Sequence, residues 1–532
     1  MERRDFVRLG LAAGAAAGAP GLGLAAPAKK ASPKFAADAM LDAGVQVQQQ
    51  AMRAGKLTAH GLATRYLARI EAVDRAGPRL RSVIELNPDA LEIARERDRE
   101  RKSGKLRGPL HGIPVLLKDN IATGDKMCTT AGSLALDGVR ATRDAHLVAR
   151  LRNAGAVILG KTNLSEWANM RSVRSTSGWS ARGGQTRNPY ALDRNTSGSS
   201  SGSAAAMAAS LATLAVGTET DGSIVSPSAS CGIVGIKPTL GLVSRAGIIP
   251  IAHSQDTAGP MTRSVADAAF LLGALSGPDP QDDVTARAPR VNYASFLRKD
   301  GLRGKRLGVA RDFFGANDGV NALIEKELTV LKEQGAILVD VTIPNSDKYG
   351  ETELTVLLHE FRPDLEAWLA AYAPHAPVKT MADIIDFNVR NAEKEMPYFG
   401  QEHLIAAQSK GGLQARDYVK ALANNRRYAR DKGIGQVMRD QKLDALVAPT
   451  GGPAWLTDYV NGDHYGSSFS SPAAVAGYPH ITVPAGLLHG LPVGLSFVGK
   501  AWSEPVLIAM AYAYEQAGRR RRAPTYAAHI KL

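Results

Sequence analysis

Two Gly/Ser-rich segments lie close together in this chain, TSGSSSGS over residues 196–203 and GTETDGSI over residues 217–224. Small residues suited to a helix fill 204–212 between them. Glycine lets a backbone approach a ligand closely, and clustered N–H groups can hold a developing negative charge. A flexible linker has a similar composition, but linkers do not alternate with a helix former and an apolar strand such as residues 233–236. We therefore expect two turns that form part of a site.

Other interpretations of these segments are weaker. A phosphate-binding loop needs a lysine before the serine that opens the helix, and none stands there. Residues 198–202 read Gly-Ser-Ser-Ser-Gly and fit a nucleophile elbow with Ser200 as nucleophile. Such an elbow follows an apolar strand, whereas residues 188–195 are polar, so we disfavour it. A Ser/His/Asp triad with His359 or His480 is disfavoured because neither histidine sits in a Gly/Asp-rich turn.

A lysine upstream makes the pattern more specific. Residues 111–120 read HGIPVLLKDN, and their apolar run predicts a buried strand that delivers Lys118 at its end. Together with the two Ser-rich turns, this motif resembles the amidase signature family of amide hydrolases. The resemblance implies a triad of Lys118 as base, Ser199 held by a cis peptide bond and Ser223 as nucleophile. Further segments that resemble family landmarks are residues 129–133, 160–163 and 232–239.

Lys118 can act as a base near neutral pH only if its pKa falls well below about 10.4. The apolar residues before it can remove water from the amine, which lowers that pKa. Asp119 would oppose the effect if it faced the same site, but successive side chains of an extended segment point to opposite faces. Lys161 is a rival base, to which the family pattern gives no role in the triad.

The resemblance also implies a mechanism. Lys118 takes a proton from Ser199, Ser199 takes one from Ser223, and Ser223 attacks the amide carbonyl to form an acyl-enzyme. The oxyanion hole would consist of backbone N–H groups from Thr220, Asp221, Gly222 and Ser223. Asp221 stands where many family members have glycine, so we expect its carboxylate to turn away from the nucleophile and form hydrogen bonds.

Several departures from the common family pattern resemble bacterial peptide amidases, which remove the C-terminal carboxamide of peptides. The departures are Asp221 and Val225, and the same resemblance extends to Trp167 and the segments 178–185 and 501–505. We therefore predict a hydrolase of carboxamide C–N bonds that releases ammonia from peptide C-terminal amides. The alternatives are a broad-specificity amidase acting on aryl or aliphatic amides, and a catalytically silent binding protein on the same scaffold.

The N-terminus has the features of an export signal. A twin arginine at residues 3–4 is followed by Phe6, a weakly apolar Ala/Gly run and a small-residue cleavage site at 26–28. We expect residues 1–28 to be a twin-arginine signal peptide and the mature protein to be periplasmic or secreted. A membrane anchor is disfavoured because the run is mostly Gly and Ala and contains Pro20. Glutaminyl-tRNA amidotransferase subunits share the signature, but export would separate this protein from tRNA.

Charge and residue composition limit the classes of partner and cofactor that we expect. The 532 residues carry a formal net charge of +14. The basic run at 519–522 has no interleaved aromatic residues and belongs to no recognisable nucleic-acid module, so we expect a solvated tail and no nucleic-acid partner. Cys128 and Cys231 fall inside apparent core motifs and are predicted to be buried free thiols. No metal-like spacing appears, so no metal or cofactor is expected. The expected partner is a small-molecule or peptide amide substrate, and the expected state is a monomer.

Strands and helices alternate along the chain. A predicted helix over 145–154 precedes a buried strand over 156–160, and residues 306–342 repeat the strand-helix-strand order. The resulting prediction is an α/β protein with a large twisted mixed β-sheet covered by helices on both faces, as in the amidase signature fold. Residues 29–532 are expected to form a single domain. Within it, the mostly helical segment from about 350 to 440 is predicted to cap the substrate cleft.

Overall fold

The structure is a computed structural model that describes residue 35 and residues 37–530. The apolar run before Lys118 forms β2 (Pro114–Lys118), and all five of its residues are buried. β2 lies between β3 (Val157–Thr162) and β6 (Leu214–Glu219) and is parallel to both. Parallel strands of this kind are covered on both faces, which explains their near-continuous apolar sequences.

These strands belong to a mixed eleven-stranded sheet. From one edge to the other the order is β1 (Val83–Leu86), β3, β2, β6, β8 (Thr257–Thr262), β7 (Val234–Lys237), β12 (His480–Leu488), β13 (Leu491–Val498), β11 (Ala445–Pro449), β9 (Arg306–Ala310) and β10 (Ile337–Val341). β9 and β10 are parallel, as the predicted strand-helix-strand unit requires, whereas β12 and β13 are antiparallel. A separate ribbon pairs β4 (Trp179–Ser180) with β5 (Gly184–Gln185).

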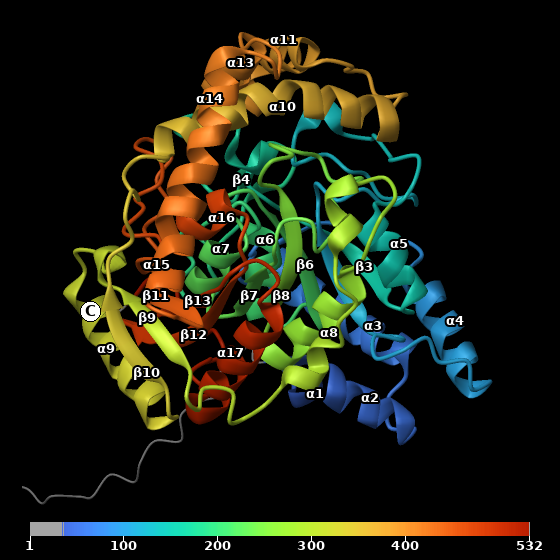
Figure 1. Cartoon of the computed structure of the whole chain (residues 1–532). Helices are drawn as coiled ribbons and strands as arrows, with labels where there is room; N and C mark the ends of the chain where they lie inside the picture. The colour runs from blue at the N-terminus through green and yellow to red at the C-terminus, as the bar shows by residue number, and fades with distance from the viewer. Residues whose placement is uncertain (1–34, 36, 531–532) are drawn as a thin grey trace, which may run out of the picture.

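Helices cover the sheet in two layers (Figure 1). One layer includes α8 and α17, which pack against each other. Of these two helices, α8 also contacts β8, and α17 also contacts β12. The second layer includes α6 and α7, which contact each other. The helices are α1 (Ala39–Asp42), α2 (Val45–Arg53), α3 (Ala59–Arg69), α4 (Ala90–Lys102), α5 (His146–Asn153), α6 (Ser201–Ala208), α7 (Val225–Ser230), α8 (Val265–Leu275), α9 (Asp318–Glu333), α10 (Gly350–Tyr372), α11 (Met381–Arg390), α12 (Ala392–Glu395), α13 (Glu402–Gln408), α14 (Arg416–Asn425), α15 (Gly435–Asp440), α16 (Ser471–Ala476) and α17 (Glu504–Gly518). The predicted fold class is confirmed.

Two helix boundaries differ from the sequence prediction. α6 begins at Ser201 and ends at Ala208, earlier than the predicted 204–212. Its Gly/Ser-rich first turn is helical because tertiary contacts hold it: the Gly202 N–H donates to the Asn163 carbonyl at 2.9 Å.

The basic run at 519–522 is not the solvated tail that its composition suggests. Arg520 forms an ion pair with Glu327, and Arg521 forms one with Asp42, each at 2.9 Å. Both partners lie far away in the sequence, so only the fold brings them to the run. The two arginines therefore anchor the chain after α17 to α9 and α1.

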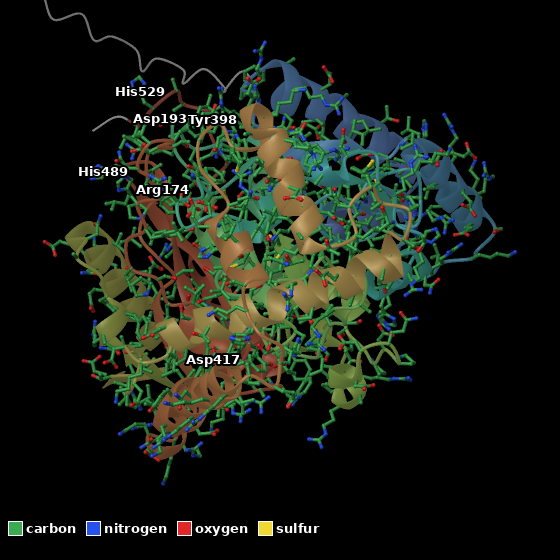
Figure 2. All side chains as sticks on the ribbon, turned by 90° about the horizontal axis from the view of Figure 1, so that it is seen from above. Arg174, Asp193, Tyr398, Asp417, His489 and His529 are labelled. Atoms are coloured by element: carbon green, nitrogen blue, oxygen red, sulfur yellow. The ribbon has the colours of Figure 1, made fainter. Side chains whose placement is uncertain are left out.

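The segment predicted as a cap contains helices α10 to α15. Figure 1 places α10, α11, α13 and α14 together above the sheet, and Figure 2, which views the molecule from above, shows this group crossing over it. The division into a signal peptide and a single domain with this cap stays a prediction. The predicted signal peptide, residues 1–28, lies outside the described residues.

Both cysteines are free and buried, as predicted. Among residues 37–530, no helix has the length and apolar character needed to cross a membrane.

Candidate active site

The end of β2 places Lys118 in a fully buried position against β6. Its Nζ lies 2.7 Å from Ser199 Oγ and 2.9 Å from Thr218 Oγ1, with the Thr218 carbonyl farther away at 3.3 Å. Asn120 Nδ2 donates to the same Thr218 hydroxyl at 3.0 Å, which fixes that group. Lys118 and Ser199, 81 positions apart, are therefore in direct contact.

Burial lowers the pKa of Lys118 to about 7, and the carboxylates of Asp256 and Glu219 only partly oppose the shift. A substantial fraction of the amine is therefore neutral at pH 7, and a neutral amine can accept a proton. Asp119 contributes no opposing charge here, because its carboxylate faces the other side and accepts from Thr130 Oγ1. The predicted alternation of side chains at the strand end is confirmed.

Ser199 follows a cis peptide bond, Gly198–Ser199, as the family resemblance implies. Its side chain is completely buried, and its carbonyl accepts from the Ser165 N–H at 3.0 Å. A Cβ on residue 198 would lie only 2.3 Å from Ser165 Oγ, so the close approach of Ser165 requires glycine there. The hydroxyl of Ser199 is thus held against Lys118 by a tightly packed turn.

The turn formed by residues 220–223 lies directly against the Ser199 turn. The Ser223 carbonyl accepts from the Ser200 N–H at 3.2 Å, and Ser226 Oγ lies 2.8 Å from Ser197 Oγ. Ser223 is 8% exposed, whereas Lys118 and Ser199 are 0% exposed. Of these three residues, only Ser223 therefore has contact with the surface.

The backbone of this turn offers free donors. Glu219 Oε2 accepts from the N–H groups of Ile224 and Val225 at 2.7 and 3.0 Å, which braces the turn from β6. In the part of the chain that the structure describes, the N–H groups of Asp221, Gly222 and Ser223 have no hydrogen-bond acceptor. Gly222 has φ +78°, a conformation that favours glycine. Clustered free N–H groups of this kind suit an anionic oxygen.

The carboxylate of Asp221 points away from these donors. It accepts from Ser471 Oγ at 2.5 Å, and burial raises its pKa. The expectation that Asp221 turns away and forms hydrogen bonds is confirmed.

The alternative nucleophile, Ser200, and the alternative bases form hydrogen bonds away from the contact between Lys118 and Ser199. The Ser200 hydroxyl is buried and is bonded to the backbone of Thr218 on β6, as donor at 3.0 Å and as acceptor at 3.2 Å. Lys161 Nζ donates to the carbonyls of Ile121 and Cys128 and to Thr129 Oγ1. The two histidines also have partners elsewhere: Ser496 lies against His480, and Asp417 against His359.

Three further residues support the site and were not found from the sequence. Asp256 accepts from Thr220 Oγ1 at 2.5 Å, Gln255 Nε2 lies 3.4 Å from the Thr220 carbonyl, and Glu353 accepts from Gln255 at 2.8 Å. They come from the loop before β8 and from α10. Their sequence neighbourhoods carry no Gly/Ser-rich turn, and the contacts span 35 positions or more, so only the fold identifies them.

Comparison with known proteins identifies the family of this chain. The family model described as Amidase matches residues 62–508. The chain belongs to the amidase signature family. This amidase is 44% identical to a probable amidase of Arabidopsis thaliana over 89% of each chain. It is also 34% identical to a glutamyl-tRNA(Gln) amidotransferase subunit from Caldanaerobacter subterraneus, over 87% of this chain and 93% of that protein.

Solved structures give the same assignment. The native peptide amidase of Stenotrophomonas maltophilia is 55% identical to this amidase, with a TM-score of 0.87, covering 90% of this chain and 98% of that one. An amidase family protein from Bacillus anthracis is 39% identical, with a TM-score of 0.83 and coverage of 91% and 92%. The protein is thus an enzyme, a hydrolase of amide C–N bonds.

Proposed function

We propose that this amidase hydrolyses the C-terminal carboxamide of peptides through an acyl-enzyme on Ser223. The observation that carries the mechanism is the contact of 2.7 Å between Lys118 Nζ and Ser199 Oγ, in a buried site where the pKa of the lysine falls to about 7. This arrangement pairs a hydroxyl with a base that is neutral in part near pH 7.

The proton moves in two steps. Neutral Lys118 accepts the Ser199 proton while Ser199 Oγ accepts the proton of Ser223, so the Ser223 oxygen attacks the carbonyl carbon and Lys118 becomes an ammonium. The relay then runs backwards to give the leaving nitrogen a proton, the C–N bond breaks and ammonia departs. Water attacks the resulting ester by the same relay, which releases the carboxylic acid and restores Ser223.

The developing oxyanion would bind to the N–H groups of residues 220–223. Those of Asp221, Gly222 and Ser223 have no acceptor among the described residues. Each well-aimed donor of an oxyanion hole contributes roughly 3 kcal/mol to transition-state stabilisation. The Asp221 carboxylate does not compete for these donors, since it bonds to Ser471.

The preference for peptide amides is supported by similarity. The Stenotrophomonas maltophilia protein named a peptide amidase shares 55% of its residues with this chain over nearly its whole length. Asp221, which departs from the common family pattern, resembles peptide amidases as well, together with Trp167 and residues 178–185. Aryl or aliphatic amides are the competing substrates, because the triad itself does not select the acyl group.

The first test measures ammonia released from a short peptide amide and aniline released from the anilide of the same peptide. We expect ammonia from the peptide amide, and a loss of activity in Ser223→Ala. Ser200→Ala is the matched control and keeps the activity. Preferential cleavage of the anilide would overturn the substrate assignment, and activity surviving in Ser223→Ala would overturn the nucleophile. A serine-directed fluorophosphonate that fails to label the folded wild type would instead favour a silent binding protein.

We also propose that the protein is exported by the twin-arginine route. The support is the twin arginine at residues 3–4, the weakly apolar run and the cleavage site at 26–28. Fusing residues 1–35 to a reporter should export it, and replacing both arginines with lysine should abolish export. Cytoplasmic retention of the unaltered fusion would contradict the proposal.

A further inference from the structure

One face of α10 presents three acidic side chains to a single short segment of the core. Glu353, Glu360 and Asp364 are spaced by seven and four positions, which places them on one side of a helix. The Asp364 carboxylate accepts from the His253 N–H at 2.9 Å, and the Glu360 carboxylate accepts from the Ser254 N–H at 2.9 Å. The third, Glu353 Oε1, accepts from the Gln255 side chain at 2.8 Å.

Glu353 is the member of this set that reaches the active-site turn. Gln255 is 3% exposed, and its Nε2 lies between Glu353 Oε1 and the Thr220 carbonyl, at 2.8 and 3.4 Å. Glu353 is itself only 8% exposed, and its carboxyl group interacts electrostatically with that of Asp221. Asp221 Oδ1 is buried, and no group within residues 37–530 donates a hydrogen bond to it. Two buried carboxyl groups that interact in this way disfavour a state in which both are ionised.

We propose that Glu353 is a positioning residue, which holds the 220–223 turn through Gln255 and Asp221 and so keeps the oxyanion N–H groups aimed at the substrate carbonyl. This inference rests on the proposed function. It assigns a role in the reaction to a cap helix that contributes no residue to the Lys118–Ser199–Ser223 set.

The surroundings favour a protonated pair over two carboxylates. Burial raises the pKa of Glu353 well above its ordinary value, and the nearby Asp221 charge raises it further. Lys237 is a cation that acts on Asp221, but its own burial lowers its pKa to about 8. Glu219 and Tyr349 also face the pair, and neither supplies positive charge. A proton held between Glu353 and Asp221 therefore links the turn to α10 without burying two like charges.

The test replaces Glu353 in two ways. Glu353→Leu keeps most of the volume but removes the acceptor for Gln255 and the carboxyl group beside Asp221, whereas Glu353→Gln keeps an acceptor for Gln255 and offers a donor to Asp221. Glu351→Leu, on the exposed side of the same helix, is the matched control. Ammonia release from a short peptide amide gives kcat and KM for each variant, and thermal unfolding shows that each is folded.

We expect Glu353→Leu to lower kcat about 100-fold with KM within about threefold, since misplaced donors stabilise the transition state less than before. Glu353→Gln should stay within about tenfold of the wild type, and the control within about twofold. A folded Glu353→Leu with kcat within about twofold of the wild type would overturn the inference, as would a rise in KM alone. If Glu353→Leu does not fold, Gln255→Leu removes the side chain that joins Glu353 to the Thr220 carbonyl. The same changes in kcat and KM then support or overturn the inference.

The two proposals fail in different ways. Wild-type protein that releases no ammonia overturns the proposed function, and the role of Glu353 falls with it. Active wild type together with an unaffected Glu353→Leu overturns only the role of Glu353.

Discussion

Two buried lysines lie on neighbouring parallel strands, and they differ in what surrounds the amine. Lys118 on β2 and Lys161 on β3 are both completely buried, and burial lowers the pKa of both. Lys161 donates to two backbone carbonyls, at 2.7 and 3.1 Å, and to one hydroxyl. Lys118 has two hydroxyls at 2.7 and 2.9 Å, and its single carbonyl is the farthest acceptor, at 3.3 Å.

The difference shows that burial alone does not make a base. A carbonyl can only accept, so it favours an amine that keeps its protons, whereas a hydroxyl can donate back to a neutral amine. Lys161 therefore cross-links the chain around Ile121 and Cys128. Lys118, next to Ser199 and Thr218, can exist in either protonation state.

The largest expected effect is the loss of Lys118. Lys118→Met removes the base, and kcat/KM for a peptide amide should fall by about 10⁴-fold or more, as for other catalytic triads. The free energy of unfolding at pH 7 should not decrease, because a buried amine without an ion-pair partner costs stability. Ammonia release and urea unfolding measure the two quantities. Activity within tenfold of the wild type would refute the role of Lys118.

Lys161→Met should have the opposite pattern. The carbonyls of Ile121 and Cys128 lose their donor in a buried site, so the free energy of unfolding should fall by about 3 kcal/mol. At a temperature where the variant stays folded, kcat should remain within about tenfold of the wild type. Urea unfolding and ammonia release again decide. A stable but inactive Lys161→Met would reverse the assignment of the two lysines.

The pH dependence sharpens the comparison further. The proposed mechanism needs neutral Lys118, whose burial lowers its pKa to about 7, so kcat/KM should rise about tenfold from pH 6 to pH 8. Lys161→Met should keep this rise of kcat/KM with pH, because the group that titrates, Lys118, is unchanged. Initial rates in buffers of constant ionic strength provide the measurement. A profile that falls steadily from pH 6 to 9 would contradict a lysine base.

The smallest expected effect comes from Ser200, which neighbours Ser199 but bonds only to backbone. Ser200→Ala should cost about 1 kcal/mol of unfolding free energy through the lost hydrogen bonds to Thr218. Its kcat/KM should stay within about threefold of the wild type. Complete inactivation of a folded Ser200→Ala would revive the nucleophile-elbow interpretation.

The candidate catalytic positions could be located from the sequence because their information is local. Lys118 ends a recognisable apolar strand, and Ser199 and Ser223 lie in compact Gly/Ser-rich turns, so short motifs carry them. Most core strands follow from apolar runs for the same reason. The apolar run before Lys118 predicts a buried strand that ends at this residue, and the strand spans 114–118 in the structure.

The remaining features depend on contacts between distant parts of the chain. In the sequence, Glu353 is one of several charged residues of a predicted helix. Only the fold shows that α10 brings it beside Gln255 and Asp221. The composition of the basic run predicts solvated arginines, whereas the fold brings Glu327 beside Arg520 and Asp42 beside Arg521. The first turn of α6 has poor helix formers, and its contact with Asn163 outweighs that local preference.

The end of β6 assigns three consecutive side chains to three different tasks. Thr218 contacts Lys118, Glu219 supports the start of α7, and Thr220 bonds to Asp256. Side chains alternate between the two faces of a strand. A single-residue insertion or deletion after Gly217 would therefore misplace all three at once. Length variation among natural or engineered relatives should be excluded from this strand and accumulate in the surface loops.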